Sequence, residues 1–152
     1  MTVRLSTQLR TNLAGTGGGF AATFANGVIE VYTGTQPVTA DAAVTGTLLG
    51  TVTLNSGAFT PGVATNGLTF AAAASGAVSK SGVWSFNGIA AGTAGWFRLK
   101  GNAVDAGSIS AVLPRLDGSV AVSGADLNLS NIAIAVSAPS TIDTFTFTIP
   151  AQ

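Results

Sequence analysis

The sequence predicts a mainly β protein, an antiparallel β-sandwich or jelly-roll-like domain with a short N-terminal helix. Segments rich in β-branched and aromatic residues run through most of the 152 residues, and turn signals separate them about every 8–12 residues. Helical spacing of apolar residues is clear in one stretch only, near the N-terminus. The length fits a single domain, whose core can form without disulfide bonds.

The expected helix covers residues 5–13. Its apolar positions recur every four residues, at Leu5, Leu9 and Leu13. Ser6 can cap its N-terminus, and Gly15 follows where a C-terminal cap belongs. A helix this short is not stable alone in water, so it must dock on the sheet or on another subunit.

A glycine-rich run over residues 15–19 follows the helix and is typical of a flexible linker. Because no strand precedes it and no Gly-Lys-Ser/Thr closes it, it does not fit a phosphate-binding loop. We therefore expect an N-terminal helical arm and hinge over residues 1–19 and a β-sandwich domain over residues 20–152.

The strands are expected where apolar and polar residues alternate between turn residues. These segments are residues 28–33, 48–54, 67–70, 83–86, 96–100, 111–116, 126–129, 132–136 and 141–149. The last is a long alternation in which Phe145, Phe147 and Ile149 share one face.

The central hairpin, residues 89–120, contains the strongest strand. Phe97 and Leu99 point to one face of that strand. The opposite face carries one tryptophan and two cations: Trp96, Arg98 and Lys100. We expect this second face to be polar and the partner strand to end at a turn formed by residues 117–118, an Asp-Gly pair.

The composition disfavours several classes of function. Charged residues make up 8% of the chain, against about 25% in a typical domain, and the net charge is +0, which disfavours nucleic-acid binding. With no histidine and no cysteine, the chain lacks the commonest general base and any thiolate ligand. We therefore expect no enzymatic activity, no cofactor and no metal site. The mean hydropathy of +0.51 favours a homo-oligomer with much of its surface covered.

A membrane location is not expected either. No unbroken apolar stretch reaches the roughly 18 residues that a membrane-spanning helix needs, and the N-terminal residues lack the apolar region of a secretory signal.

The six acidic residues do not single out the pair of carboxylates that a glycosidase needs. Asp105 and Asp117 are better explained as turn residues. Asp126 begins a run of oxygen-bearing side chains, but Asn131 and Ser137 stand where a calcium loop has its glycine and its final acid. A strand followed by a turn is the favoured interpretation there.

Trp84 and Trp96 allow two interpretations. We favour burial in the core, because large aromatic rings bury much apolar area, over a platform for stacking a sugar ring. Beside Trp96, the cations Arg98 and Lys100 could equally form an exposed contact patch or a solvated sheet face.

A protein interface is expected at the helix and at the central strand. Arg4 and Arg10 flank the leucines and would help the arm to dock on a negatively charged partner. The candidate interface residues are Arg4, Leu5, Leu9, Arg10, Leu13, Trp96, Arg98 and Lys100. Residues 42–79 carry no formal charge, and part of this segment is also expected in an interface.

Several stretches carry a resemblance, in this order along the chain: RLSTQLRTNL, FANGVIEVYTGTQP, GTLLGTVTL with SGAFTPG and TNGLTF, GTAGWFRLKGNAVDAG, LPRLDGS, SGADLNLSNIAI and TIDTFTFTIPAQ. Together they resemble a family of small uncharacterised virion proteins from tailed bacteriophages, over nearly the whole chain. The resemblance implies a structural component of the particle, and within that a jelly-roll-like head decoration or cement protein. It supplies no functional residues.

The expected function is therefore that of a non-enzymatic virion protein that binds and stabilises the major capsid lattice, assembled in the host cytoplasm. The alternatives are a tail component, such as a tube or fibre-associated subunit, and a carbohydrate-binding β-sandwich module. The expected partners are the major capsid protein or other virion proteins and further copies of the chain, with no nucleic acid and no membrane.

Overall fold

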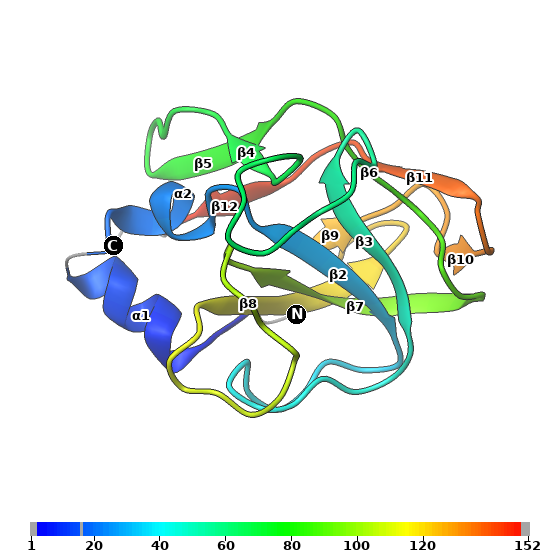
Figure 1. Ribbon diagram of the computed structural model, residues 1–152, viewed down its shortest axis with the longest axis horizontal. Helices are drawn as coiled ribbons and strands as arrows, with labels where there is room; N and C mark the ends of the chain where they lie inside the picture. Colours follow the sequence, from blue (N-terminus) through cyan, green and yellow to red (C-terminus); the bar gives the residue numbers. More distant parts are fainter. Residues whose placement is uncertain (1–2, 16, 150–152) are drawn as a thin grey trace.

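The protein is mainly β, as predicted, with 37% strand and 10% helix in a computed structural model that describes residues 3–15 and 17–149 (Figure 1). The elements in the described residues are β1 (Arg4–Leu5), α1 (Thr7–Ala14), α2 (Gly19–Phe24), β2 (Val28–Thr33), β3 (Leu48–Leu54), β4 (Thr69–Phe70), β5 (Ala77–Ser81), β6 (Trp84–Asn87), β7 (Gly92–Lys100), β8 (Arg115–Ala121), β9 (Leu127–Asn128), β10 (Ala133–Ile134), β11 (Pro139–Ile142) and β12 (Thr146–Thr148).

The strands form two sheets. The larger has the order β1-β8-β7-β2-β3-β6-β11, with β9 paired to β8 and β10 paired to β7, and the smaller has the order β12-β5-β4. All pairings between these strands are antiparallel except β8 with β9. This arrangement is consistent with the β-sandwich expected from the sequence.

The apolar core lies between the two sheets. Phe97 of the large sheet meets Phe145 at 6.4 Å between ring centroids. From α2, Phe20 stacks on Phe147 of the small sheet at 4.1 Å. Trp84 is fully buried in the same cluster, which confirms its expected place in the core.

Two strands have the limits that the sequence predicted, β2 and β3. The partner strand of the central hairpin was expected over residues 111–116, but β8 covers Arg115–Ala121 and overlaps it by two residues only. The Asp117–Gly118 pair lies inside this strand rather than at a turn, so that prediction was wrong. A side chain at Gly118 would place its Cβ 2.6 Å from the Phe97 ring, so this glycine is required by packing.

The expected C-terminal strand 141–149 is two strands. β11 pairs with β6 in the large sheet, whereas β12 pairs with β5 in the small sheet. Residues 143–145 connect them, so the chain passes from one sheet to the other within what looked like a single alternation.

The N-terminal segment is built into the sheet more closely than an arm would be. Ser6 caps α1 as predicted, accepting from the Leu9 N–H at 3.1 Å, but Leu5 belongs to β1, which pairs with β8. Leu9 has no exposed surface and is part of the core. The Ser6 hydroxyl also donates to the Leu113 carbonyl at 3.0 Å. The described part of the segment 1–19 therefore contributes to the packing of the β-domain.

We expect the Leu9→Ala variant to lose about 2–5 kcal/mol of unfolding free energy, because it leaves a cavity in the core. Urea unfolding measures the loss, and Thr11→Ala, on the exposed side of the same helix, should change stability by no more than about 0.5 kcal/mol. Equal stability of the two variants would mean that the helix is an independent arm.

Candidate functional site

Four charged side chains of alternating sign form a row across four neighbouring strands of the large sheet. Arg4 in β1 is the cross-strand partner of Asp117 in β8, and Asp117 is also the partner of Arg98 in β7. On its other side, Arg98 is the partner of Glu30 in β2, whose partner in β3 is the uncharged Thr51. Cross-strand partners share a face, so the row lies on the side of the sheet opposite the core. Each charge in the row therefore has a neighbour of opposite sign, and we call this side the charged face.

Arg98 and Asp117 form the centre of the charged face, and neither side chain has exposed surface. The guanidinium donates from Nε to Oδ1 and from Nη2 to Oδ2, both at 2.7 Å, and from Nη1 to the Ala42 carbonyl at 3.0 Å. It also lies 5.6 Å from the ring centre of Trp96. Burial raises the pKa of Asp117, and the hydrogen bonds and charge of Arg98 oppose that rise.

Arg115 and Asp105 form a second buried pair with the same two-pronged geometry. The two hydrogen bonds measure 2.7 Å and 2.6 Å, and Arg115 Nη2 also donates to the Ser108 carbonyl at 2.8 Å. Burial acts to raise the pKa of Asp105, but hydrogen bonds from Arg115 and from the Gly107 N–H, with the charge of Lys100, outweigh it and lower the pKa.

Lys100 and Glu30 form the third pair, with 2.7 Å between Nζ and Oε2. Nζ also donates to the Asp105 carbonyl at 2.7 Å, which ties this pair to the second. Tyr32 donates its hydroxyl proton to Glu30, and its ring stacks on Trp96 at 4.7 Å. Burial first, and then Glu30, raise the pKa of Tyr32 far above its ordinary value.

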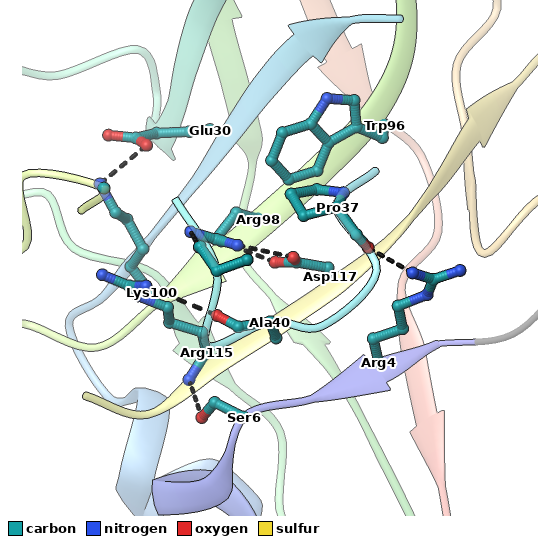
Figure 2. A network of polar contacts seen from close by, with 12 residues as sticks. Arg4, Ser6, Glu30, Pro37, Ala40, Trp96, Arg98, Lys100, Arg115 and Asp117 are labelled. Atoms are coloured by element: carbon teal, nitrogen blue, oxygen red, sulfur yellow. Dashed lines mark hydrogen bonds and ion pairs between the residues drawn. The ribbon is translucent and has the colours of Figure 1, made fainter. Parts of the chain in front are cut away.

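Two long loops, residues 34–47 and 101–114, cover the charged face, and we call them the loop layer. Figure 2 shows the segment from Pro37 to Ala40 crossing over the charged side chains, where the carbonyls of these two residues accept from arginines. The two loops also bind each other, through the Val44 N–H and the Gly107 carbonyl at 2.9 Å. The loop layer therefore excludes water from the ion pairs and supplies acceptors for the donors that the carboxylates leave unused.

This arrangement hides half of the formal charges of the chain. Six of the twelve charged residues lie in the three pairs, and the remaining six are Arg4, Arg10, Asp41, Lys80, Asp126 and Asp143. The described surface exposes ten large aliphatic side chains: Val38, Val63, Val83, Ile89, Val104, Ile109, Val112, Val122, Val136 and Ile149. Four of these, between 76% and 86% exposed, are on the loop layer: Val38, Val104, Ile109 and Val112.

Four of the interface residues predicted from the sequence are buried within the chain. Trp96, Arg98 and Lys100 have at most 5% of their surface exposed, because the loop layer covers their face. Leu9 is in the core. The prediction that these side chains contact a partner was wrong. Period-two alternation separates the faces of a strand, but it does not show which face a loop will cover.

Three of the other predicted residues, Leu5, Arg10 and Leu13, line a surface groove of about 620 Å³. The remaining residue, Arg4, donates to the Pro37 carbonyl under the loop layer. β1 and α1 form one wall of the groove, and residues 146–149 form the other. Sequence analysis missed the second wall, because only the folded sheets bring β12 next to the N-terminal segment.

A smaller hollow of about 360 Å³ lies at the edge of the charged face. Glu30, Thr51, Phe59 and Lys100 are among its lining residues. Its carboxylate and its ammonium group bind each other, and neither has the histidine or thiol neighbour that acid–base chemistry commonly uses.

The Asp126 carboxylate is used inside the fold. Its Oδ2 accepts from the Ser119 N–H at 2.9 Å and from the Ser119 hydroxyl at 2.8 Å. Within residues 3–15 and 17–149, no three or more acidic, histidine or cysteine side chains gather as a metal site would require. The sugar-stacking interpretation is wrong for the two tryptophans, because neither Trp84 nor Trp96 has exposed surface.

Compared with known protein families, curated proteins and solved structures, the chain shows no significant match. Across the part of the chain that the structure describes, neither helix is long and apolar enough to cross a membrane.

The Asp117→Asn variant leaves the Arg98 guanidinium buried without a counter-charge, so we expect it to lose about 3–5 kcal/mol of unfolding free energy. Removing both charges, by Arg98→Met with Asp117→Leu, should cost less than the single change. Guanidinium unfolding measures both variants, with the exposed Asp143→Asn as the control. A double variant less stable than Asp117→Asn would contradict this account of the pair.

Tyr32 is the only tyrosine in the chain, so its ionisation can be followed directly by ultraviolet absorbance. Because the folded state favours the neutral phenol, its contribution to stability is present below pH 10.0 and is lost as the pH rises toward the higher folded-state pKa. The folded protein should therefore show no tyrosinate step at pH 10.0, whereas the chain unfolded in guanidinium should show one. A native titration near the ordinary pKa would contradict the burial of Tyr32 and its contact with Glu30.

Proposed function

We propose that this chain is a non-enzymatic structural protein of a tailed-bacteriophage particle, which binds and stabilises the capsid lattice through the loop layer. The observation that carries the proposal is the distribution of charge. The chain places half of its formal charges in pairs under the loop layer and exposes four large aliphatic side chains on the outside of that layer.

Such a surface suits a permanent contact better than free solution. Charged residues are depleted at the centres of interfaces. Repetition of a modest contact over a lattice raises the effective affinity without further contacts. The resemblance to virion proteins of tailed phages supports the same function.

The buried network favours a scaffold role over catalysis. In the described residues, no buried side-chain nitrogen or oxygen lacks a hydrogen-bond partner, so the network leaves no free group aimed at a substrate. The Arg115–Asp105 pair, together with hydrogen bonds from Arg98, Lys100 and Arg115 to loop carbonyls, fixes the loop layer on the sheet, which gives the outer surface a defined shape. A rigid surface loses little conformational entropy when it docks.

We expect the purified protein to bind capsids that lack it, in a saturable ratio, and to raise the temperature at which those capsids break. Co-sedimentation and thermal disruption of the particles measure the two effects. Ile109→Asp should weaken binding at least about tenfold, because it places a charge in the centre of the contact. Val122→Asp, the same change outside the loop layer, is the matched control.

The same assay decides between the alternatives. Binding to tails and not to capsids would identify a tail component and overturn the capsid assignment. Full binding by the Ile109→Asp variant would overturn the role of the loop layer. Light scattering of the free protein at several concentrations measures self-association, for which we expect a homo-oligomer.

A further inference from the structure

The groove between α1 and β12 is bounded by strands whose outer edges are free. Its lining includes the apolar side chains of Leu5, Leu13 and Phe147. β1 is the last strand of the large sheet on this side, and β12 is the last strand of the small sheet. Figure 1 shows β12 at the end of the molecule that carries the two helices.

The pairing of β12 with β5 determines which backbone groups face outward. Phe145 accepts from β5 at 3.0 Å, and the Ile149 N–H donates to the residue before β5 at 2.9 Å. Alternate residues of an antiparallel strand direct their backbone groups to opposite sides, so Thr146 and Thr148 direct theirs away from β5. Within residues 3–15 and 17–149, these outward groups have no hydrogen-bond partner.

The edge strand β1 also directs backbone groups outward that pair with no other described strand. The Ser6 N–H donates to the Arg115 carbonyl of β8 at 3.0 Å, and Arg4, two residues earlier, faces β8 as well. The N–H and C=O of Leu5 therefore point away from β8, and among the described residues they have no partner in another strand.

The opposite edge of the large sheet, β11, is blocked at its first residue. Just before β11, the Ala138 carbonyl accepts from the Gly88 N–H at 3.0 Å, so the next residue, Pro139, faces outward. A proline at that position has no N–H to offer to another chain. Thr141, the other outward residue of β11, keeps its N–H, whereas both outward residues of β12, Thr146 and Thr148, keep theirs.

We propose that the groove binds an extended segment of a different protein, which adds to β12 as a further strand. Its main chain pairs with Thr146 and Thr148, and its apolar side chains alternate onto Leu13 and Phe147. A carboxylate on the segment faces Arg10, which is exposed and whose hydrogen bond is to the Thr7 hydroxyl at 3.3 Å. Among the described residues, no carboxylate lies within ion-pair distance of Arg10.

The test is selection from a random heptapeptide library with the full-length protein as bait. We expect enriched sequences with apolar residues at alternate positions and at least one acidic residue. Thr148→Pro removes one outward N–H, and it should weaken binding of an enriched peptide about fivefold to tenfold, the value of one main-chain hydrogen bond. Equal enrichment by the Thr148→Pro bait would overturn strand addition.

A second variant keeps the test valid if the proline disturbs folding. Arg10→Glu changes an exposed side chain and should shift the selected peptides from acidic to basic. Lys80→Glu, the same reversal on β5 and outside the groove lining, should leave the acidic preference unchanged. A preference that is unaffected by Arg10→Glu would overturn the contact.

The selection also distinguishes a second copy of this chain from a different protein as the occupant of the groove, and it tests the groove independently of the proposed function. Enrichment of sequences that match residues 141–149 would identify a second copy of this chain as the occupant and overturn the assignment to a different protein. Because the selection uses no capsid and the capsid assay uses no peptide, either proposal can fail while the other stands.

Discussion

Desolvation of Arg98 and Asp117 is the constraint on which the rest of the structure depends. Two charges removed from water are tolerated only when they face each other with good geometry and when every remaining donor finds an acceptor. The register of β7 with β8 places the two residues directly opposite, and the loop layer supplies an acceptor for Nη1, the guanidinium nitrogen that does not bind Asp117. The long loops are therefore part of the folded domain, because without them the charged face would be an ordinary solvated sheet.

The same constraint shapes the outer surface. A chain with few charged residues that uses half of them inside has little left with which to orient a partner by charge. Recognition must then rest on shape, apolar contact and main-chain hydrogen bonds, which salt screens much less than it screens exposed charges. A contact of this kind, repeated over a lattice, is sustained by geometry and number rather than by long-range attraction.

The sequence predicted correctly the limits of those strands that local alternation and flanking turn residues determine. β2 and β3 have glycine or turn residues beyond their ends and alternate within, so their limits followed from the sequence. The Asp117–Gly118 pair has the chemistry of a turn, and only the partners it meets in the fold, an arginine and a phenylalanine ring, make it part of a strand. The prediction that the charged face contacts a partner was wrong for the same reason, because no local signal shows that a distant loop will cover Arg98 and Lys100.

Only one wall of the groove could be predicted from the sequence, because the other wall comes from a distant part of the chain. Leu5, Arg10 and Leu13 were candidates from the N-terminal sequence, although Leu5 lies in β1 and not in the helix, but the second wall comes from a strand more than a hundred residues later. The proposed site rests on a difference between edges: β11 has a proline at one of its two outward positions, whereas both outward residues of β12 have unpaired backbone groups among the described residues. Free edges invite association with other chains, so a free edge beside an apolar groove favours pairing at that place.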